Sequence, residues 1–377
     1  MPSSAPTGRG ARPAEAAVGL RAATWIALVA FAVLALVSAR HGQDLTVFWR
    51  AARRLVSGAP LYRDDEWLAW RYAPGAALLF APLAALPLGW ARAAWLVLVA
   101  GSGVLLVRSL ARRTQGAPPT LVALCTLLAL ARPLVEEFAC GQVNLVLTTL
   151  LVAAFAIEDR RPVAAGALLA VAVGLKLAPA ILVVDAVLRR RGRVLGGVAL
   201  AGVLLVLAPV PFYGLRGTVA LHGAWFRSLT GTSPELITSP GNQSVFGVAA
   251  RLGIPSAVAA LACVALLGWL LALRRRDARE PLLLWATAFA SPMGWIQNHV
   301  FGLPAVYGAL GGAGGGERAL LAAVGVALLV PMYDLGGPRL EAWAFERSVP
   351  ALALGLLLAC AAWRLVRRDR RLTGPAR

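Results

Sequence analysis

Residues 160–193 read RRPVAAGALLAVAVGLKLAPAILVVDAVLRRRGR. An apolar run of this length is typical of a membrane segment, since a spanning helix needs about 20 apolar residues. Both flanks of the run are rich in arginine, and arginine-rich flanks belong on the cytoplasmic side of a membrane. A run with both ends on one side cannot cross the membrane once. The sequence therefore predicts a hairpin of two half-helices over 163–188.

The whole chain has the composition of a protein that lies in lipid. Of its 377 residues, 59% are hydrophobic and 15% are charged, against about 25% charged residues in ordinary globular proteins. The mean hydropathy is +0.71. A globule of this size could not bury so much apolar surface. The composition predicts an all-α polytopic integral membrane protein, and it excludes a soluble enzyme, a collagen-like chain and a disordered tail.

The charge balance is strongly basic, with 37 basic residues against 18 acidic and a formal net charge of +19. A soluble domain this basic would favour nucleic acid. Here the arginines stand in short clusters between apolar runs, which is the distribution of cytoplasmic loops in membrane proteins. We therefore expect no nucleic-acid partner, and we place on the cytoplasmic side the N-terminus and the clusters at 108–113, 189–193, 274–279 and 364–371.

These clusters give an outline of the chain in the cell membrane. Hydropathy predicts roughly ten to twelve crossings, with many runs interrupted by Pro or Gly, and the segment 74–89 is expected to be re-entrant. The N-terminus is predicted to be a signal anchor, because no cleavage site follows its apolar run. The predicted parts are a cytoplasmic tail (1–21), a single transmembrane domain (22–366) with external loops at about 40–74 and 214–253, and a second cytoplasmic tail (367–377).

The first external stretch predicts an amphipathic helix. From Leu45 to Ser57 the apolar positions recur at i, i+3, i+4 and i+7 while arginines take the other face, and Gly58 and Pro60 stop the pattern. Such a helix is expected to lie in the membrane interface. Asp44 at its start either caps the helix or acts as a general base that faces lipid-borne substrate and water together.

Lys176 is the only lysine in the chain, and it stands inside a long apolar run. An ionisable residue at membrane depth is costly and functional by default. Pro179 follows three residues later and breaks the helix there. Lys176 either snorkels to the interface or places a cation against a phosphate.

Other polar residues also stand in apolar surroundings. Their amides either bond neighbouring helices or bind substrate, and a lone histidine is more often a satisfied buried imidazole. The three groups are Glu136, Glu137, Gln142 and Asn144; Asn242, Gln243 and Ser244; and Ser291, Gln297, Asn298 and His299. The sequence has neither the ligand spacing of a metal site nor a phosphate-binding fingerprint. We therefore expect no metal and no cofactor.

Taken together, these strings resemble the polyprenyl-phosphate-mannose-dependent α-mannosyltransferases, glycosyltransferase family 87 of the GT-C superfamily. The resemblance covers about residues 20–365. The matching strings are DLTVFWRAA and GAPLY within 44–62, YAPG at 72–75, GQVNL at 141–145, GLKLAP at 174–179, NQS at 242–244 and SPMGW at 291–295. One departure follows the S-P segment. The family often shows W-x-H-H there, whereas this chain reads Trp295, Ile296, Gln297, Asn298, His299.

The resemblance implies that a sugar, mannose by the name of the family, moves from a polyprenyl phosphate to a hydroxyl of a glycolipid or glycan acceptor on the non-cytoplasmic face. The family's aspartate after the first span maps onto Asp44, the predicted catalytic residue. The residues predicted to bind the donor phosphate or substrate are Lys176, His299, Arg50, Tyr62, Tyr72, Gln142, Asn144, Asn242, Gln243 and Asn298. Because the leaving group is already a phosphate, no metal is strictly needed, and a single displacement inverts the anomeric centre.

Two other classes of function suit parts of this sequence. A multi-pass transporter or lipid flippase would also suit an intramembrane lysine and broken helices, but the chain shows no paired halves with matching interruptions. An amphipathic helix with an acid at its start is not something that transport requires. A non-catalytic assembly protein is the third alternative.

Overall fold

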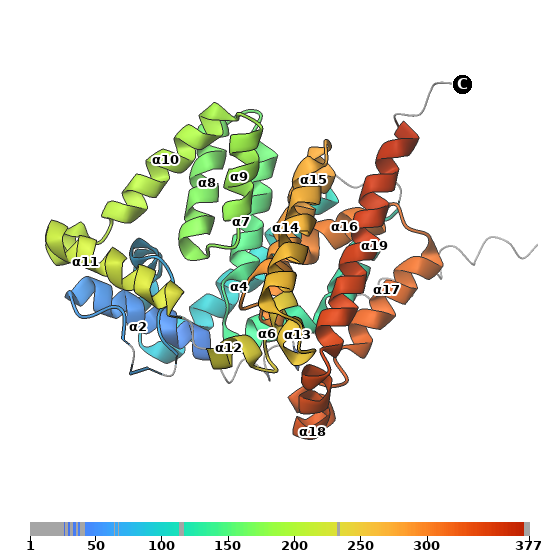
Figure 1. The fold of residues 1–377 in the computed structure, drawn as a ribbon, viewed down its shortest axis with the longest axis horizontal. Helices are drawn as coiled ribbons and strands as arrows, with labels where there is room; N and C mark the ends of the chain where they lie inside the picture. The colour runs from blue at the N-terminus through green and yellow to red at the C-terminus, as the bar shows by residue number, and fades with distance from the viewer. Residues whose placement is uncertain are drawn as a thin grey trace, which may run out of the picture.

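The computed structural model describes residues 42–63, 65–66, 68–112, 117–231 and 234–372, with side chains to residue 367, and a few isolated residues between 26 and 37. In these ranges every regular element is a helix, so the prediction of an all-α polytopic membrane protein is confirmed (Figure 1). The predicted tail 1–21 and residues 373–377 lie outside the described residues, and α19 extends past the predicted boundary at 366.

The helices, in chain order, are α2 (Gln43–Ser57), η2 (Pro74–Phe80), α3 (Ala81–Ala84), α4 (Leu88–Ala111), α5 (Pro119–Ala129), α6 (Ala131–Cys140), α7 (Asn144–Ile157), α8 (Pro162–Leu175), α9 (Ala180–Leu188), α10 (Gly192–Leu207), α11 (Val210–Thr230), α12 (Pro234–Thr238), α13 (Val245–Arg251), α14 (Ser256–Ala272), α15 (Arg276–Ala290), η3 (Ile296–Gly302), α16 (Leu303–Gly311), α17 (Gly315–Ala327), α18 (Tyr333–Glu346) and α19 (Val349–Leu372).

Two of the described helices, α4 and α19, are long and apolar enough to cross a bilayer unaided. Two bent pairs would each make one more crossing: α6 with α7, which meet at 115°, and α10 with α11, which meet at 97°. The ten to twelve crossings that hydropathy predicts are therefore more than the described helices show by length and composition. Several apolar runs are divided into shorter helices, as at Leu130, where the backbone leaves the helical conformation (φ −113°, ψ 24°) between α5 and α6.

The predicted hairpin over 163–188 is present as α8 and α9, which are joined by a short non-helical break at Lys176. Its two ends meet, because Arg191 just past α9 lies 3.3 Å from the carboxylate of Glu158 just before α8. A helix pair with both ends at one place does not cross the membrane as a single span. The arginine flanks of the sequence thus predicted the hairpin correctly.

The neighbouring helices α8 and α10 approach closely through two glycines. A Cβ atom on Gly166 would lie 2.0 Å from the carbonyl oxygen of Val194, and one on Gly197 would lie 2.0 Å from that of Val163. Small residues at helix contacts let backbones approach where lipid provides no hydrophobic force between helices. This contact holds the hairpin against the rest of the bundle.

Ion pairs bring together the arginine cluster that follows α9 and the one at the start of α15. Arg191 bridges to Glu280 at 2.8 Å, and Arg279 bridges to the buried Asp185 at 2.8 Å. Arg276 also pairs with Glu158. Figure 1 shows α2 and α12 along the lower edge of the molecule and the C-terminal end of α19 at the top. The two predicted external stretches touch each other, since Trp225 of α11 donates a hydrogen bond to the carbonyl of Arg71 at 3.2 Å.

The amphipathic helix α2 begins at Gln43 and ends at Ser57, where Gly58 takes the left-handed conformation (φ 67°) of a helix C-cap. The amphipathic helix predicted in the first external stretch is therefore present, and its apolar face packs against the rest of the protein. Protein covers that face: Phe48 is buried and stacks on Phe80 with ring centroids 4.7 Å apart. Amphipathic spacing indicates an apolar neighbour, and this neighbour is the segment around η2 rather than lipid.

Candidate active site

Asp44 lies in the first turn of α2, and the structure excludes its role as a helix cap. The N-cap position is Gly42, and no side-chain hydrogen bond caps the helix. Instead, Oδ2 of Asp44 accepts a hydrogen bond of 2.7 Å from Nε2 of Gln142, which is 98 residues away in the chain. The carboxylate is therefore held by a side chain of another element, and it is half-buried rather than sealed.

Gln142 reaches Asp44 because the GQVN turn between α6 and α7 packs on the start of α2. Gly141 ends α6 with φ 67°, and a Cβ atom there would lie 3.0 Å from Cβ of Leu45. The indole N–H of Trp95 donates to the carbonyl of Gly141 at 2.9 Å and fixes the turn from the other side. A glycine is needed at this position by both its dihedral angle and the close approach.

Lys176 occupies the break between α8 and α9, where its backbone is extended (φ −158°, ψ 129°). Its ammonium donates hydrogen bonds of 2.7 Å to the amide oxygens of Asn144 and Asn298, and it lies 5.9 Å from the ring centroid of Phe301. The side chain is thus directed into the protein, so the alternative in which it snorkels to an interface is wrong. Three segments that are distant in sequence meet at this one cation.

Glu137 supports the lysine through Asn144. This fully buried carboxylate accepts 2.8 Å hydrogen bonds from Nδ2 of Asn144 and from the backbone N–H of Leu145. Asn144 also donates to the carbonyl of Gln297 at 3.3 Å. A continuous row runs from Glu137 through Asn144 to Lys176. The sequence marked Glu137 as a polar residue in apolar surroundings but did not place it in the site, and burial of an ionisable residue at membrane depth was the available signal.

The two predicted tyrosines lie on the Asp44 side of the cluster. The hydroxyl of Tyr62 donates to the carbonyl of Tyr72 at 2.7 Å. The ring of Tyr72 packs edge-on against Phe48 at 5.3 Å, and Tyr72 lies within interaction range of Asp44 and Gln142. Tyr72 therefore borders the candidate site, while Tyr62 contacts the backbone of Tyr72.

Burial raises the pKa of the Asp44 carboxyl above its ordinary value. The hydrogen bond from Gln142 and the charge of Lys176 act in the opposite direction without cancelling this effect. A carboxylate with a raised pKa is a stronger base toward a hydroxyl proton. Among the described residues, Asp44 and Lys176 are both half-buried rather than fully enclosed.

Three predicted residues are not brought to this cluster in a form that can bind substrate. Arg50 lies on the exposed face of α2. Asn242 is fully buried and has both amide hydrogens donated, to the carbonyls of Ile237 and Pro292, while its oxygen accepts from two backbone N–H groups. Gln243 is likewise fully buried and bonds to backbone groups of other segments. These two amides fix loops together.

His299 follows Asn298 in η3, yet its ring lies in a different environment. The indole N–H of Trp285 approaches Nδ1 of His299 at 3.3 Å, and the ring of Phe289 lies edge-on with centroids 4.4 Å apart. His299 is fully buried, and Nε2 has no hydrogen-bond partner among the described residues. The structure gives Asn298, and not His299, to the lysine. Within the described part of the chain, no three His, Cys, Asp or Glu side chains gather as a metal site would require.

The chain matches a known family over more than half of its length. Residues 70–296 match the family model of Glycosyltransferase family 87. The chain therefore belongs to glycosyltransferase family 87 and is a membrane glycosyltransferase. The resemblance that the short strings indicated is confirmed.

Curated relatives carry more specific names. The chain is 30% identical over 370 residues, covering 87% of this chain and 84% of the relative, to a polyprenol-phosphate-mannose-dependent alpha-(1-2)-phosphatidylinositol pentamannoside mannosyltransferase of Mycobacterium tuberculosis (strain CDC 1551 / Oshkosh). It is 28% identical over 303 residues, 69% of this chain and 68% of the relative, to a polyprenol-phosphate-mannose-dependent alpha-(1-2)-phosphatidylinositol mannoside mannosyltransferase of Mycolicibacterium smegmatis.

Proposed function

We propose that this chain transfers a mannosyl group from polyprenyl-phosphate mannose to a hydroxyl of a phosphatidylinositol mannoside or a related glycolipid. The proposal rests on one cluster that holds both a base and a cation. Asp44 is hydrogen-bonded to Gln142 and Lys176 is hydrogen-bonded to Asn144, and both of these amides belong to the GQVN turn. The names of the relatives support the choice of donor and acceptor.

Asp44 is the proposed general base. Gln142 occupies its Oδ2, and among the described residues no donor is bonded to Oδ1, which leaves that oxygen for the proton of the acceptor hydroxyl. The hydroxyl oxygen then forms a bond to C1 of the sugar while the bond from C1 to the phosphate oxygen breaks. The polyprenyl phosphate leaves with the electron pair, and the proton stays on Asp44.

Lys176 is the proposed phosphate ligand. An ammonium has three N–H donors, and two of them are used by Asn144 and Asn298. The third is available for a phosphate oxygen of the donor. A fixed cation at the place where negative charge develops stabilises the transition state. Neutral amide partners hold the lysine in place without neutralising it.

The stereochemistry and the metal requirement follow from this scheme. One displacement inverts C1, so the α linkage in the names of the relatives would require a β-linked donor. A phosphate leaves without protonation by an acid, and Lys176 supplies a positive charge. We therefore propose an inverting, metal-independent transfer.

The proposed face of the membrane is the non-cytoplasmic one. The positive-inside rule favours the cytoplasmic side for the ion-paired arginines near Arg191, and α2 lies along the opposite edge of the molecule (Figure 1). In a cysteine-free background, a cysteine at Ser57 should react with an impermeant maleimide added outside cells, whereas one at Gly192 should react only after lysis. Reaction of both from the same side would contradict this orientation.

The activity is tested by reconstitution of the purified chain with radiolabelled β-linked polyprenyl-phosphate mannose and a series of phosphatidylinositol mannosides. We expect a lipid product that gains one mannose, that α-mannosidase cleaves, and that forms equally well in EDTA. Transfer from another polyprenyl-phosphate sugar, with no transfer from the mannose donor, would support the transferase activity but overturn the assignment of mannose as the sugar. A β-linked product would overturn the single displacement.

A further inference from the structure

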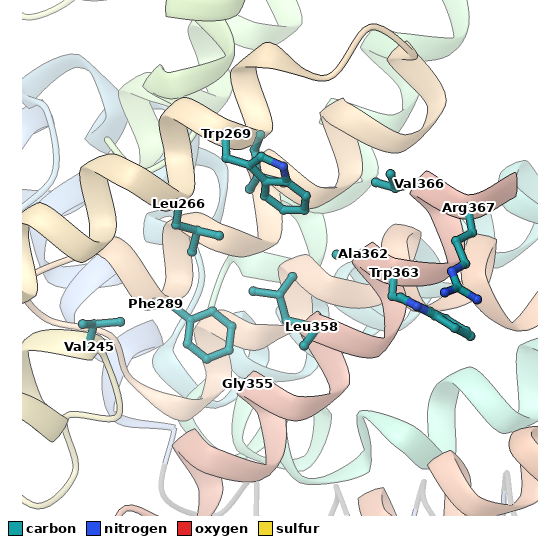
Figure 2. Close-up of a pocket in the computed structure, with 12 residues that line it drawn as sticks. Val245, Leu266, Trp269, Phe289, Gly355, Leu358, Ala362, Trp363, Val366 and Arg367 are labelled. Carbon is teal, nitrogen blue, oxygen red and sulfur yellow. The ribbon is translucent and has the colours of Figure 1, made fainter. Parts of the chain in front are cut away.

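A groove of about 630 Å³ lies between α14, α15 and α19, and neither Lys176 nor its hydrogen-bond partners line it. Its lining is almost wholly apolar, with Leu266, Phe289 and Leu358 along its length. Figure 2 shows Trp363 and Arg367 at one end of the groove and Val245 and Phe289 toward the other. The volume is within the roughly 300–1,000 Å³ of sites that hold a small ligand.

The groove opens on a surface that faces lipid in a membrane protein. Apolar side chains at the groove are exposed on both bordering helices: Trp269 of α14 and Trp363 of α19 belong to its lining, and Leu352 and Leu356 are exposed on α19. Phe289 forms its inner wall and contacts the buried His299 with ring centroids 4.4 Å apart. The groove is therefore separate from the Asp44 cluster and accessible from the bilayer.

Arg367 gives this apolar groove a charge. Its guanidinium lies over the ring of Trp363, 4.3 Å from the centroid, and among the described residues no carboxylate forms an ion pair with it. Arg364, one turn earlier on α19, is by contrast paired with Glu317.

Apolar shape alone would not select a ligand here, because lipid chains are as apolar as the groove itself. An unpaired cation at its end does select, since basic sites between membrane helices bind anionic headgroups. Tryptophan is also the residue that marks the level of the headgroups, and Trp363 stands at this end. We infer that the groove binds an anionic phospholipid from the leaflet that borders the end of α19, with its phosphate at Arg367 and one acyl chain extending toward Phe289.

The test is native mass spectrometry of the full-length purified protein titrated with phosphatidylglycerol or with phosphatidylcholine of identical acyl chains. We expect the wild-type protein to bind one phosphatidylglycerol about 5- to 10-fold more tightly than phosphatidylcholine. Arg367→Ala should remove this preference. Arg347→Ala is the matched control, because Arg347 is also exposed and stacks on a tryptophan, Trp343 at 5.1 Å, but lies outside the groove.

A second variant separates the groove from a general surface charge. Ala359→Phe fills the groove from α19 without touching a charge, and it should lower binding of phosphatidylglycerol to the level of Arg367→Ala. Equal affinity of the wild-type protein for the two lipids, or a preference that survives both substitutions, would overturn the inference. Displacement of phosphatidylglycerol by stoichiometric polyprenyl phosphate would also overturn it, because the groove would then belong to the donor's tail.

Discussion

Replacement of Asp44 by asparagine separates catalysis from structure at this position. Asparagine keeps an oxygen that can accept the 2.7 Å hydrogen bond from Gln142, so the contact between α2 and the GQVN turn should survive. The amide cannot take a proton from a hydroxyl. We expect Asp44→Asn to insert, fold and bind donor as the wild type does, and to lose about 10²- to 10⁴-fold in transfer rate, the usual contribution of a general base.

The stability of this variant has its own expected value. Loss of a helix cap costs about 0.5–2 kcal/mol, but Asp44 caps nothing in the structure, so that cost should be absent. The raised pKa means that the folded protein holds the carboxyl proton more tightly than the unfolded chain does. Such a carboxylate opposes folding at neutral pH, and its removal should leave the melting temperature unchanged or slightly higher.

The assay measures transfer and thermal unfolding on the same preparation in nanodiscs. Arg53→Gln is the matched control, because Arg53 is on the same helix, is exposed, and stacks only on Trp49 at 4.7 Å. Its transfer rate should equal that of the wild type. An Asp44→Asn protein with normal turnover would refute the assignment of the base, and one with low turnover and a lowered melting temperature would refute the separation of the two roles.

Four further outcomes follow from the geometry. Lys176→Met should raise the donor KM about 10- to 100-fold, the value of one hydrogen bond to a charged group, and should leave the acceptor KM nearly unchanged. Lys176→Arg should restore only part of the donor affinity. Equal effects on both KM values would argue against a phosphate contact. Glu137→Gln leaves one of two buried donors without its acceptor and should lower stability by about 1–3 kcal/mol, measured by thermal unfolding; an unchanged melting temperature would contradict this. Gly197→Val should destabilise by about 1–3 kcal/mol or more by overpacking against α8, whereas Gly202→Val on the same helix has open space and serves as control. Because the pKa of Asp44 is raised, kcat should fall on acidification at a pH above the ordinary aspartate value of about 3.9; a fall centred below that value would oppose the role of Asp44.

The sequence predicted the features whose signals are local. Arginine on both flanks and Pro179 within the run predicted the hairpin, because charge and helix breaking act where the residues stand. The scarcity of lysine pointed to Lys176. Its partners could not be predicted, since Asn298 lies 122 residues away and Gln142 lies 98 residues from Asp44. Only the folded chain brings them together.

Other features of the structure could not be predicted from the sequence, for identifiable reasons. The spacing of α2 indicates an apolar neighbour but not whether that neighbour is lipid or protein, and Phe48 is covered by protein. A buried amide looks the same in sequence whether it faces a ligand or a backbone, and Asn242 faces backbone. Glu137 and Glu136 are adjacent and identical in type. Glu137 is fully buried and accepts a hydrogen bond from Asn144, while Glu136 forms an ion pair with Arg132.

The two neutral partners of Lys176 have a consequence for turnover. The asparagine oxygens form no ion pair with the ammonium, so in the proposed reaction this cation would meet more negative charge after the transfer than before it. The donor is a phosphate diester with one charge, whereas the released polyprenyl phosphate is a monoester that carries about 1.5 to 2 negative charges at neutral pH, as phosphorylated side chains do. Free polyprenyl phosphate should consequently bind more tightly than the sugar-bearing donor. Its release, rather than the chemical step, should then limit the rate. Added polyprenyl phosphate should act as a competitive inhibitor of the donor.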